Sequence, residues 1–230
     1  MLTNPYHNLT GGRWLKSNFH THAGTGAGTC GAYETEDVLR LYKEAGYDVV
    51  CISNHDLYSD TKALGRILGI QTINGFEYSQ DSHMLCIGGT GLIKADHQKA
   101  IDECRAQGGL VVLCHPHWQH RNYWAPEALA ALRGYTGIEI FNTVIFRLTG
   151  TGLATDLWDE MLSQGRLMWG FANDDFHRWF DLARCWNLVW ARPGDNDDLK
   201  NALAAGRFYA STGLVLKDIG FENGTIHVAA

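Results

Sequence analysis

The chain has 230 residues, 45% of them hydrophobic, and a formal net charge of −6. This length can bury a sizeable core as one large domain, or as one domain with a small appendage. The acidic balance argues against a stable nucleic-acid partner, because such binding relies on Lys and Arg to neutralise phosphates. No segment approaches the ~18 apolar residues of a membrane span, and residues 1–12 lack the apolar stretch of a secretory signal. We therefore expect a cytoplasmic protein without a membrane partner.

The six cysteines are scattered and form no Cys-x-x-Cys pair. Several lie within apolar runs, where a reduced thiol behaves as a small hydrophobic side chain. We expect no disulfide framework.

The N-terminal half alternates strand-like and helix-like segments. Residues 14–22 suit an extended strand, and Thr35 begins a helical pattern that Gly46 ends. The apolar run 47–53 has the length and composition of a strand buried on both faces of a parallel sheet. The elements expected after it are, in order, a short helix at 61–68, strands at 71–77 and 83–88, a helix at 96–107 and a strand at 110–114.

The alternation continues in the C-terminal half. The expected elements are, in order, a helix at 126–132, a strand at 137–141, a helix at 156–163, a strand at 167–172, a helix at 195–205 and a strand at 207–211. Asn223-Gly224 then separates residues 218–222 from 225–228, which is a strong signal for a β-hairpin. We predict one domain over residues 1–213 and a C-terminal hairpin extension, packed on it, over residues 214–230.

The repeated order of strand, polar residue and helix predicts an α/β fold with a parallel sheet and helical crossovers. At this length the sheet can close into a barrel. Polar residues at the C-terminal ends of the strands would then meet at one rim, where the active sites of such folds are built.

His20 and His22 are the first candidates for a metal site. In an extended strand both imidazoles lie on one face and can hold one ion, although a chance polar strand face would give the same pattern. Further candidate ligands each lie just after, or at the start of, a short apolar run: His55, Glu77, His83, His115, Asp175 and His177.

Several motifs occur in a characteristic order between residues 14 and 180 and together resemble the PHP (polymerase and histidinol phosphatase) superfamily. They are Trp14 to His22 with the glycine-rich run after it, Ser53-Asn54-His55-Asp56, Gly75-Phe76-Glu77, His83, Cys114-His115-Pro116, Glu139-Ile140-Phe141-Asn142 and Asp174-Asp175-Phe176-His177. The segment 206–213 is similar to the end of stand-alone members, including the carbaryl-hydrolase-like branch. The resemblance implies a distorted (β/α)7 TIM-like barrel with up to three metal ions at the C-terminal rim. Most characterised members are phosphoesterases.

Carried onto this sequence, the resemblance implies three groups of ligands. The first ion takes His20, His22 and Asp175. Glu77 bridges to a second ion that also takes His83 and His115, and a third ion takes the remaining pair, His55 and His177.

The sequence departs from the family pattern at the third site. The family places an aspartate five residues after the second histidine of His-x-His, where this chain has Ala27. The family's Thr-Asp-His is also changed, with Asn54 in place of the aspartate that would orient the imidazole. The third site therefore lacks an anionic ligand unless Asp56, Thr25, a water molecule or the substrate completes it.

These ligands predict two to three divalent transition-metal ions. Imidazoles and carboxylates suit zinc, manganese and iron, and the donor set does not choose among them. Two such ions ~3.5–4 Å apart lower the pKa of a shared water and stabilise the attacking and leaving oxygens of a phosphoryl displacement. We assign catalytic roles to Glu77, Asp175 and His177. The sequence contains neither a Gly-x-Ser-x-Gly elbow nor a P-loop.

Candidate substrate-binding residues follow the predicted rim motifs. Arg147 and Arg178 are placed to clamp a phosphate in two-pronged fashion, or they are ordinary surface arginines. His117 belongs to an aromatic loop, residues 117–124, which is either a substrate wall or a solvated loop. We expect Asp174 to support the ligands and leave Glu139 outside the metal set.

Three functions remain open. The first is a phosphoesterase that attacks a small phosphomonoester or nucleotide with metal-bound hydroxide, which gives the protein an anionic small-molecule substrate. The second is a carbamate, ester or amide hydrolase that uses the same metals. The third is a metal-binding regulatory module with a degraded site, and the retained ligands count against it. Arginines facing the metals would favour the first reading over the second. The sequence leaves the oligomeric state open.

Overall fold

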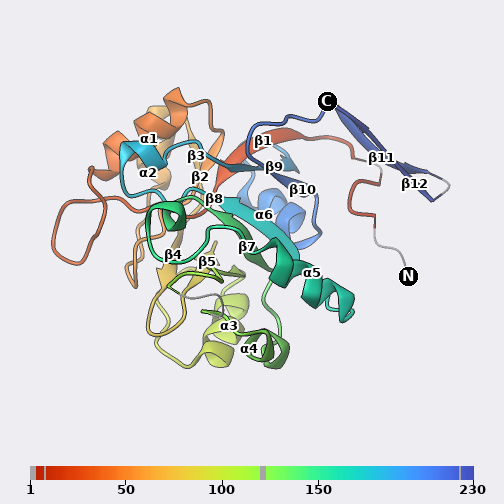
Figure 1. Cartoon of the computed structure of the whole chain (residues 1–230). Coiled ribbons are helices and arrows are strands. Elements are labelled where there is room, and N and C mark those ends of the chain that lie inside the picture. The colour runs from red at the N-terminus through yellow and green to blue at the C-terminus, as the bar shows by residue number, and fades with distance from the viewer. Residues whose placement is uncertain (1–3, 8, 120–122, 223) are drawn as a thin grey trace.

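Two five-stranded sheets form the centre of the computed structural model, which describes residues 4–7, 9–119, 123–222 and 224–230 (Figure 1). The first sheet has the order β10-β9-β1-β2-β3, with bounds Phe208–Ser211, Trp186–Ala191, Arg13–Asn18, Val49–Val50 and Gln71–Thr72. The second has the order β4-β5-β6-β7-β8, with bounds Gly75–Tyr78, Met84–Ile87, Leu110–Leu113, Gly137–Asn142 and Trp169–Asn173.

Both sheets mix parallel and antiparallel pairs. Strands β1, β2 and β3 are parallel, as are β6, β7 and β8, whereas β9 runs antiparallel to β1 and β10, and β5 antiparallel to β4 and β6. A short loop without a crossover helix joins β4 to β5, and such a connection gives an antiparallel pair. The predicted α/β class is confirmed. The structure does not show the predicted closed barrel. In the described residues, the two sheets are joined only by isolated β-bridges, between Thr21 and Phe176 and between His55 and Glu77.

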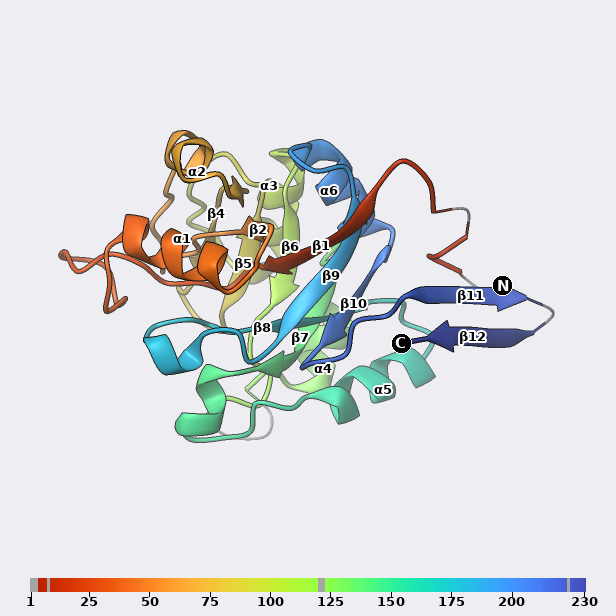
Figure 2. The ribbon, with the colours of Figure 1, turned by 90° about the horizontal axis from the view of Figure 1, so that it is seen from above.

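Helices cover the outer face of each sheet (Figure 2). Helices α1 (Thr35–Glu44) and α2 (Lys62–Leu68) pack Val38, Leu39 and Leu68 against Val50 and Ile52 of the first sheet and its extension. The second sheet is covered by α3 (His97–Ala106), α4 (Pro126–Ala131) and α5 (Thr155–Ser163). Each expected helix is present, with ends shifted by one or two residues.

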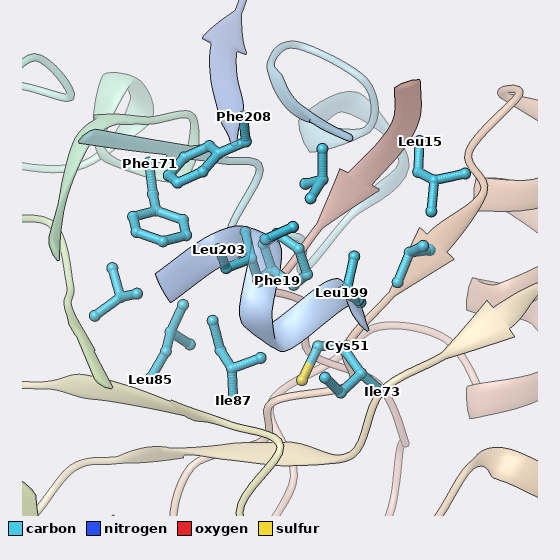
Figure 3. Packing of buried hydrophobic residues seen from close by; sticks show 14 of the residues in the cluster. Leu15, Phe19, Cys51, Ile73, Leu85, Ile87, Phe171, Leu199, Leu203 and Phe208 are labelled. Carbon is cyan, nitrogen blue, oxygen red and sulfur yellow. The ribbon is translucent and has the colours of Figure 1, made fainter. Parts of the chain in front are cut away.

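The main core lies between the sheets. Figure 3 shows Phe19, Phe171 and Phe208 packed around Leu199 and Leu203, which helix α6 (Asn196–Ala204) inserts into the interior. Helix α6 starts at the edge of the first sheet where β1 begins, because Ala191 at the end of β9 pairs with Arg13. The opposite edge, where β1 ends, is left for polar side chains.

The strand expected at 71–77 is divided into β3 and β4, which belong to different sheets, and strand β9 was not predicted. Its run Trp186–Ala191 lies inside the first sheet, between β1 and β10. The run carries no charge and has strand length, so the signal was present. No chemistry-bearing motif follows it, because β9 runs antiparallel and ends at the other edge.

The C-terminal strands β11 (Asp218–Glu222) and β12 (Thr225–Ala229) pair as an antiparallel hairpin. Asn223 of the predicted turn lies outside the described residues. A cavity of about 150 Å³ separates the hairpin from residues 4–6. The domain division at residue 213 stays a prediction.

All six cysteines are free, and Cys30 alone among them is exposed. In the described part of the chain, no helix is both long and apolar enough to cross a membrane.

Candidate metal centre

The predicted ligand residues converge at one edge of the two sheets. His20 and His22 follow β1, His55 follows β2, Glu77 lies in β4, His83 precedes β5, His115 follows β6, and Asp175 and His177 follow β8. The C-terminal ends of parallel strands meet at one edge. His83 reaches the same edge from the start of its strand because β5 runs antiparallel to its neighbours.

Glu77 lies at the centre of the cluster and is fully buried. Its Oε2 is 3.2 Å from Nε2 of His20, 3.3 Å from Nε2 of His22 and 2.9 Å from Nδ1 of His55. Its Oε1 is 2.9 Å from Nδ1 of His83 and 3.3 Å from Nε2 of His115. Each carboxylate oxygen thus faces its own group of imidazoles, which is the arrangement of a bridging ligand.

Asp175 closes the first of these groups. Its Oδ1 lies 3.2 Å from Nε2 of His20 and 3.1 Å from Nε2 of His22. Its Oδ2 accepts a hydrogen bond of 3.2 Å from the Asn142 amide. The backbone of Asp175 has φ +50°, and that of His115 has φ +30°. A non-glycine residue in this region costs on the order of 1–3 kcal/mol, and such strain gathers at functional sites.

Several atoms at the centre of the cluster are buried and lack a hydrogen-bond partner. They are Nε2 of His20, both ring nitrogens of His22, Nδ1 of His55, Oε2 of Glu77 and Oδ1 of Asp175. Buried polar atoms are nearly always satisfied, and leaving one unpaired costs a few kcal/mol. Cations shared by these atoms would satisfy them, and the imidazole and carboxylate donors suit divalent transition metals. The residues therefore fit a metal centre.

Charge is strongly coupled within the cluster. Burial alone would lower the pKa of His20, but the carboxylates of Asp175, Glu77 and Glu139 outweigh it and hold that pKa well above its usual range. Burial likewise opposes the charged form of Glu77, yet the surrounding imidazoles, with His20 foremost, hold the pKa of Glu77 well below normal. The same balance raises the pKa of His22 and lowers that of Asp175.

Glu139 supports the ligands from beneath. Its carboxylate accepts hydrogen bonds from Nδ1 of His20 at 2.9 Å and from the backbone N–H of His115 at 2.8 Å. The amides of Asn142 and Asn173 donate to it at 2.8 and 2.9 Å. A carboxylate on the second ring nitrogen of a metal-binding histidine fixes the ring and its tautomer. Glu139 therefore leaves Nε2 of His20 as the nitrogen available to a metal.

Asp174 faces away from the cluster. It accepts hydrogen bonds from the backbone N–H groups of Ala183 at 2.8 Å and Arg184 at 3.0 Å, and from the Tyr42 hydroxyl at 3.1 Å. It thus fixes the loop after β8 instead of joining the predicted ligands.

Cys30 is a potential ligand that the sequence analysis missed. Its Sγ is 3.3 Å from Nε2 of His177, and it belongs to a group with His22, His55 and His177 whose donor atoms lie within 4.8 Å of one another. Partial burial opposes ionisation, but the three histidines, His177 first, lower the pKa of the Cys30 thiol to about 4. The signal in the sequence was weak: Cys30 stands in the glycine-rich loop, outside any apolar run.

The predicted substrate-binding residues do not line the cavity over the ligands. Arg147 directs Nε and Nη2 at the carboxylate of Asp181, at 2.8 and 2.9 Å. Arg178 is exposed, and His117 is buried with Nε2 3.0 Å from Asp156. The cavity itself, of about 80 Å³, is lined by His55, His83, His115, Trp118, Val144, Ile145, Leu148, Asp175 and His177.

Among the described residues of the aromatic loop, Trp118 lines this cavity. Its ring centroid lies 5.3 Å from that of His83 and 4.9 Å from that of His115. Residues 120–122 of the same loop lie outside the described residues.

Several solved structures are similar to this one, among them those of three bacterial proteins. A two-domain protein from Bacteroides vulgatus ATCC 8482, described as containing a predicted PHP-like metal-dependent phosphoesterase, matches with TM-score 0.66 and 20% identity, over 92% of this chain and 69% of that one. A candidate metal-dependent phosphoesterase from Bifidobacterium adolescentis ATCC 15703 matches with TM-score 0.55 and 14% identity, over 82% and 96% of the two chains. PsfC from Pseudomonas syringae PB-5123 matches with TM-score 0.59 and 11% identity, over 87% and 92%. The chain shares their fold.

The structural likeness supports the PHP resemblance at the level of the fold. No protein-family model and no curated protein matches the sequence. The proposed similarity to the carbaryl-hydrolase-like branch stays a prediction.

Proposed function

We propose that this protein is a metal-dependent phosphoesterase that hydrolyses a small phosphomonoester or nucleotide. The observation that carries the proposal is the position of Glu77, with each carboxylate oxygen directed at a separate group of buried imidazoles. His20, His22 and Asp175 would hold one divalent ion, and His83 and His115 a second, with Glu77 between them. Divalent ions bound there would acidify a water molecule and offset the charge of a phosphate.

The protein's own groups orient the ligands and exclude bulk water. The His20 and His22 side chains are fully buried, so these two donors are shielded from solvent. Nδ1 of His177 donates to the backbone carbonyl of Asp175 at 2.8 Å, which leaves Nε2 as the nitrogen with a free lone pair. Because the walls of the cavity over the ligands include Val144, Ile145 and Leu148, the space suits a small reacting group.

The names of two structural neighbours support a phosphoester as the substrate. A small anionic molecule also suits a site that concentrates divalent cations, because the ions themselves would offset the charge of a phosphate. The retained and converging ligands count against a degraded regulatory module.

Carbonyl hydrolysis is the second candidate, and one observation favours it. The two-pronged edge of Arg147 that a phosphate would use is taken by Asp181. A neutral carbamate, ester or amide needs no such clamp, and the apolar wall and Trp118 could receive its uncharged groups.

A matched pair of substrates separates the two candidates. An aryl phosphate and the aryl acetate with the same leaving group are assayed after loading with manganese, zinc or iron. We expect turnover of the phosphate to exceed that of the acetate and inorganic phosphate to inhibit competitively. Faster turnover of the acetate, with no competitive inhibition by inorganic phosphate, would assign the protein to carbonyl hydrolysis.

The variant Glu77→Gln tests whether the measured turnover belongs to this site. Replacing one carboxylate oxygen by an amide should lower kcat/KM by more than about tenfold, or about 1.4 kcal/mol of barrier. The matched control is Glu103→Gln, since Glu103 is exposed on α3. Equal activity in both variants would mean that Glu77 does not bridge.

A further inference from the structure

Three histidines at one side of the cluster lie near Glu77 or Asp175 but lack the further aspartate that the family pattern places beside them. His22, His55 and His177 form this group, and Ala27 has no donor atom. Asp56 is engaged elsewhere: its carboxylate accepts from Ser79 Oγ at 2.7 Å and from Gln80 Nε2 at 2.9 Å.

Thr25 is also unavailable, because its hydroxyl donates to Glu34. Asn54, which replaces the expected aspartate, accepts a hydrogen bond from the backbone N–H of Ala23 at 2.9 Å. The side chains of Asp56, Thr25 and Asn54 therefore all form hydrogen bonds within the surrounding loops.

The loop between β1 and α1 instead carries Cys30 to these histidines. Gly24 N–H donates to Tyr33 C=O at 2.7 Å and closes the loop at its base. The N–H of Ala32, two residues beyond Cys30, donates to the carbonyl of His177 at 3.1 Å.

The chain next to Cys30 also depends on a glycine. A Cβ on Gly31 would lie 2.7 Å from Cα of Ala23, so only glycine allows the loop to return this close to the end of β1. The two residues that follow Cys30 therefore hold it close to His177 and Ala23.

Two independent observations indicate a ligand in this group. The Cys30 sulfur lies 3.3 Å from Nε2 of His177, and Nδ1 of His177 is already bonded to a carbonyl, so the nitrogen facing the sulfur carries the lone pair. His22 is fully buried, yet neither of its ring nitrogens has a hydrogen-bond partner. Cys30, His55 and His177 therefore present a thiol and two partly exposed imidazoles to one space beside the buried His22 ring, and this donor set suits a cation.

We propose that Cys30, with His55 and His177, holds a further metal ion through a thiolate, in a site that His22 borders. The inference rests on the proposed metal centre but not on the reaction that the centre catalyses. A thiolate and imidazoles are the donors of zinc sites, and a soft sulfur ligand disfavours manganese and magnesium. The chain therefore combines an oxygen- and nitrogen-rich pair of sites with one sulfur-containing site, which would load with zinc, iron or cobalt.

Cobalt serves as the probe, because a Co²⁺–thiolate bond gives a ligand-to-metal charge-transfer absorption in the near ultraviolet that carboxylates and imidazoles do not give. The parent protein saturated with cobalt should show this band, and Cys30→Ser should lose it together with about one ion per chain by elemental analysis. The matched control is Cys104→Ala, which removes a buried cysteine in α3 and should keep the band.

A second variant guards against a general loss of structure. Cys30→Asp should recover the lost ion without the charge-transfer band and should accept manganese more readily than the parent. An undiminished band and metal content in Cys30→Ser would overturn the proposal. The absorption band and the metal content are both independent of turnover, so they test the thiolate site even if the protein is not a phosphoesterase. Phosphoesterase activity in a protein that lacks the band would refute the thiolate site and leave the proposed function intact.

Discussion

Glu139 shows how one residue can serve several ligands at once. It is fully buried and bonds to the ring of His20 and the backbone of His115, which belong to different predicted metal groups. Removing such a support lowers metal affinity or activity by about 10–100-fold in other metal sites. We expect Glu139→Gln to fall in this range for metal affinity, measured by competition with a chromophoric chelator. The exposed Glu160→Gln serves as the control, and equal affinities would show that Glu139 is only a structural group.

The shifted pKa values of the cluster predict that metal binding depends on pH. Neighbouring carboxylates outweigh burial and raise the pKa values of His20 and His22, so these rings keep to a higher pH than a free imidazole the protons that a cation must displace. Affinity should therefore rise with pH, by about tenfold per pH unit for each proton released, and fall on acidification. Calorimetric titration in buffers of different ionisation enthalpy measures the protons released. Affinity that is constant between about pH 6 and pH 8 would contradict the prediction.

At the scale of elements, the loop after β8 is held by Asp181 in the short helix Trp179–Asp181. Asp181 is buried and accepts from both prongs of Arg147 and from the backbone N–H groups of His177 and Arg178, at 3.0 and 2.9 Å. Arg147 thus braces the loop that carries His177, and a bound phosphate is not needed to explain its position.

Removing Asp181 should destabilise the protein more than removing its partner Arg147. Asp181→Ala leaves two backbone donors and a guanidinium unpaired, and we expect a loss of about 2–4 kcal/mol in the free energy of unfolding. Arg147→Ala should cost less, about 1–2 kcal/mol, because that side chain is 34% exposed. Urea unfolding with an unchanged m-value measures both. Losses that are equal, or reversed in order, would show that the backbone contacts to Asp181 contribute little.

The sequence predicted the elements, and the convergence of the candidate ligands, better than the connections between strands. Candidate ligands such as His55 and His115 were selected because they end apolar runs, and the ends of parallel strands must meet. The open arrangement of the sheets was not predicted, because antiparallel pairing of β5 depends on which strand edges meet. Cys30 and the pairing of Arg147 with Asp181 were missed for a similar reason, since loop closure and a contact across 34 residues leave no local pattern.

At the scale of the whole molecule, metal ions would connect the two sheets. His20, His22 and His55 extend from the first sheet, whereas Glu77, His115 and Asp175 extend from the second. Removing the ions should therefore lower the stability of the entire fold. At a free metal concentration 100 times Kd, one bound ion contributes about 2.7 kcal/mol. For a domain of this size that corresponds to roughly 5–10 °C in Tm.

Calorimetric scans before and after chelation test this effect. The lower Tm should return to its starting value when zinc or manganese is added back. A Tm that does not change on chelation would mean that the ions, if bound, do not hold the sheets together.

The wide spacing of the ligands along the chain also bears on folding kinetics. Phe19 N–H, next to His20, donates to the side chain of Asn173, 154 positions later, so the first and last ligand segments meet only when the sheets have assembled. Contacts that form after the transition state slow unfolding and leave the folding rate nearly unchanged. Removing the metal should therefore raise the unfolding rate in urea and leave the refolding rate almost unchanged. The ions would bind late in folding and lengthen the lifetime of the native protein by slowing its unfolding.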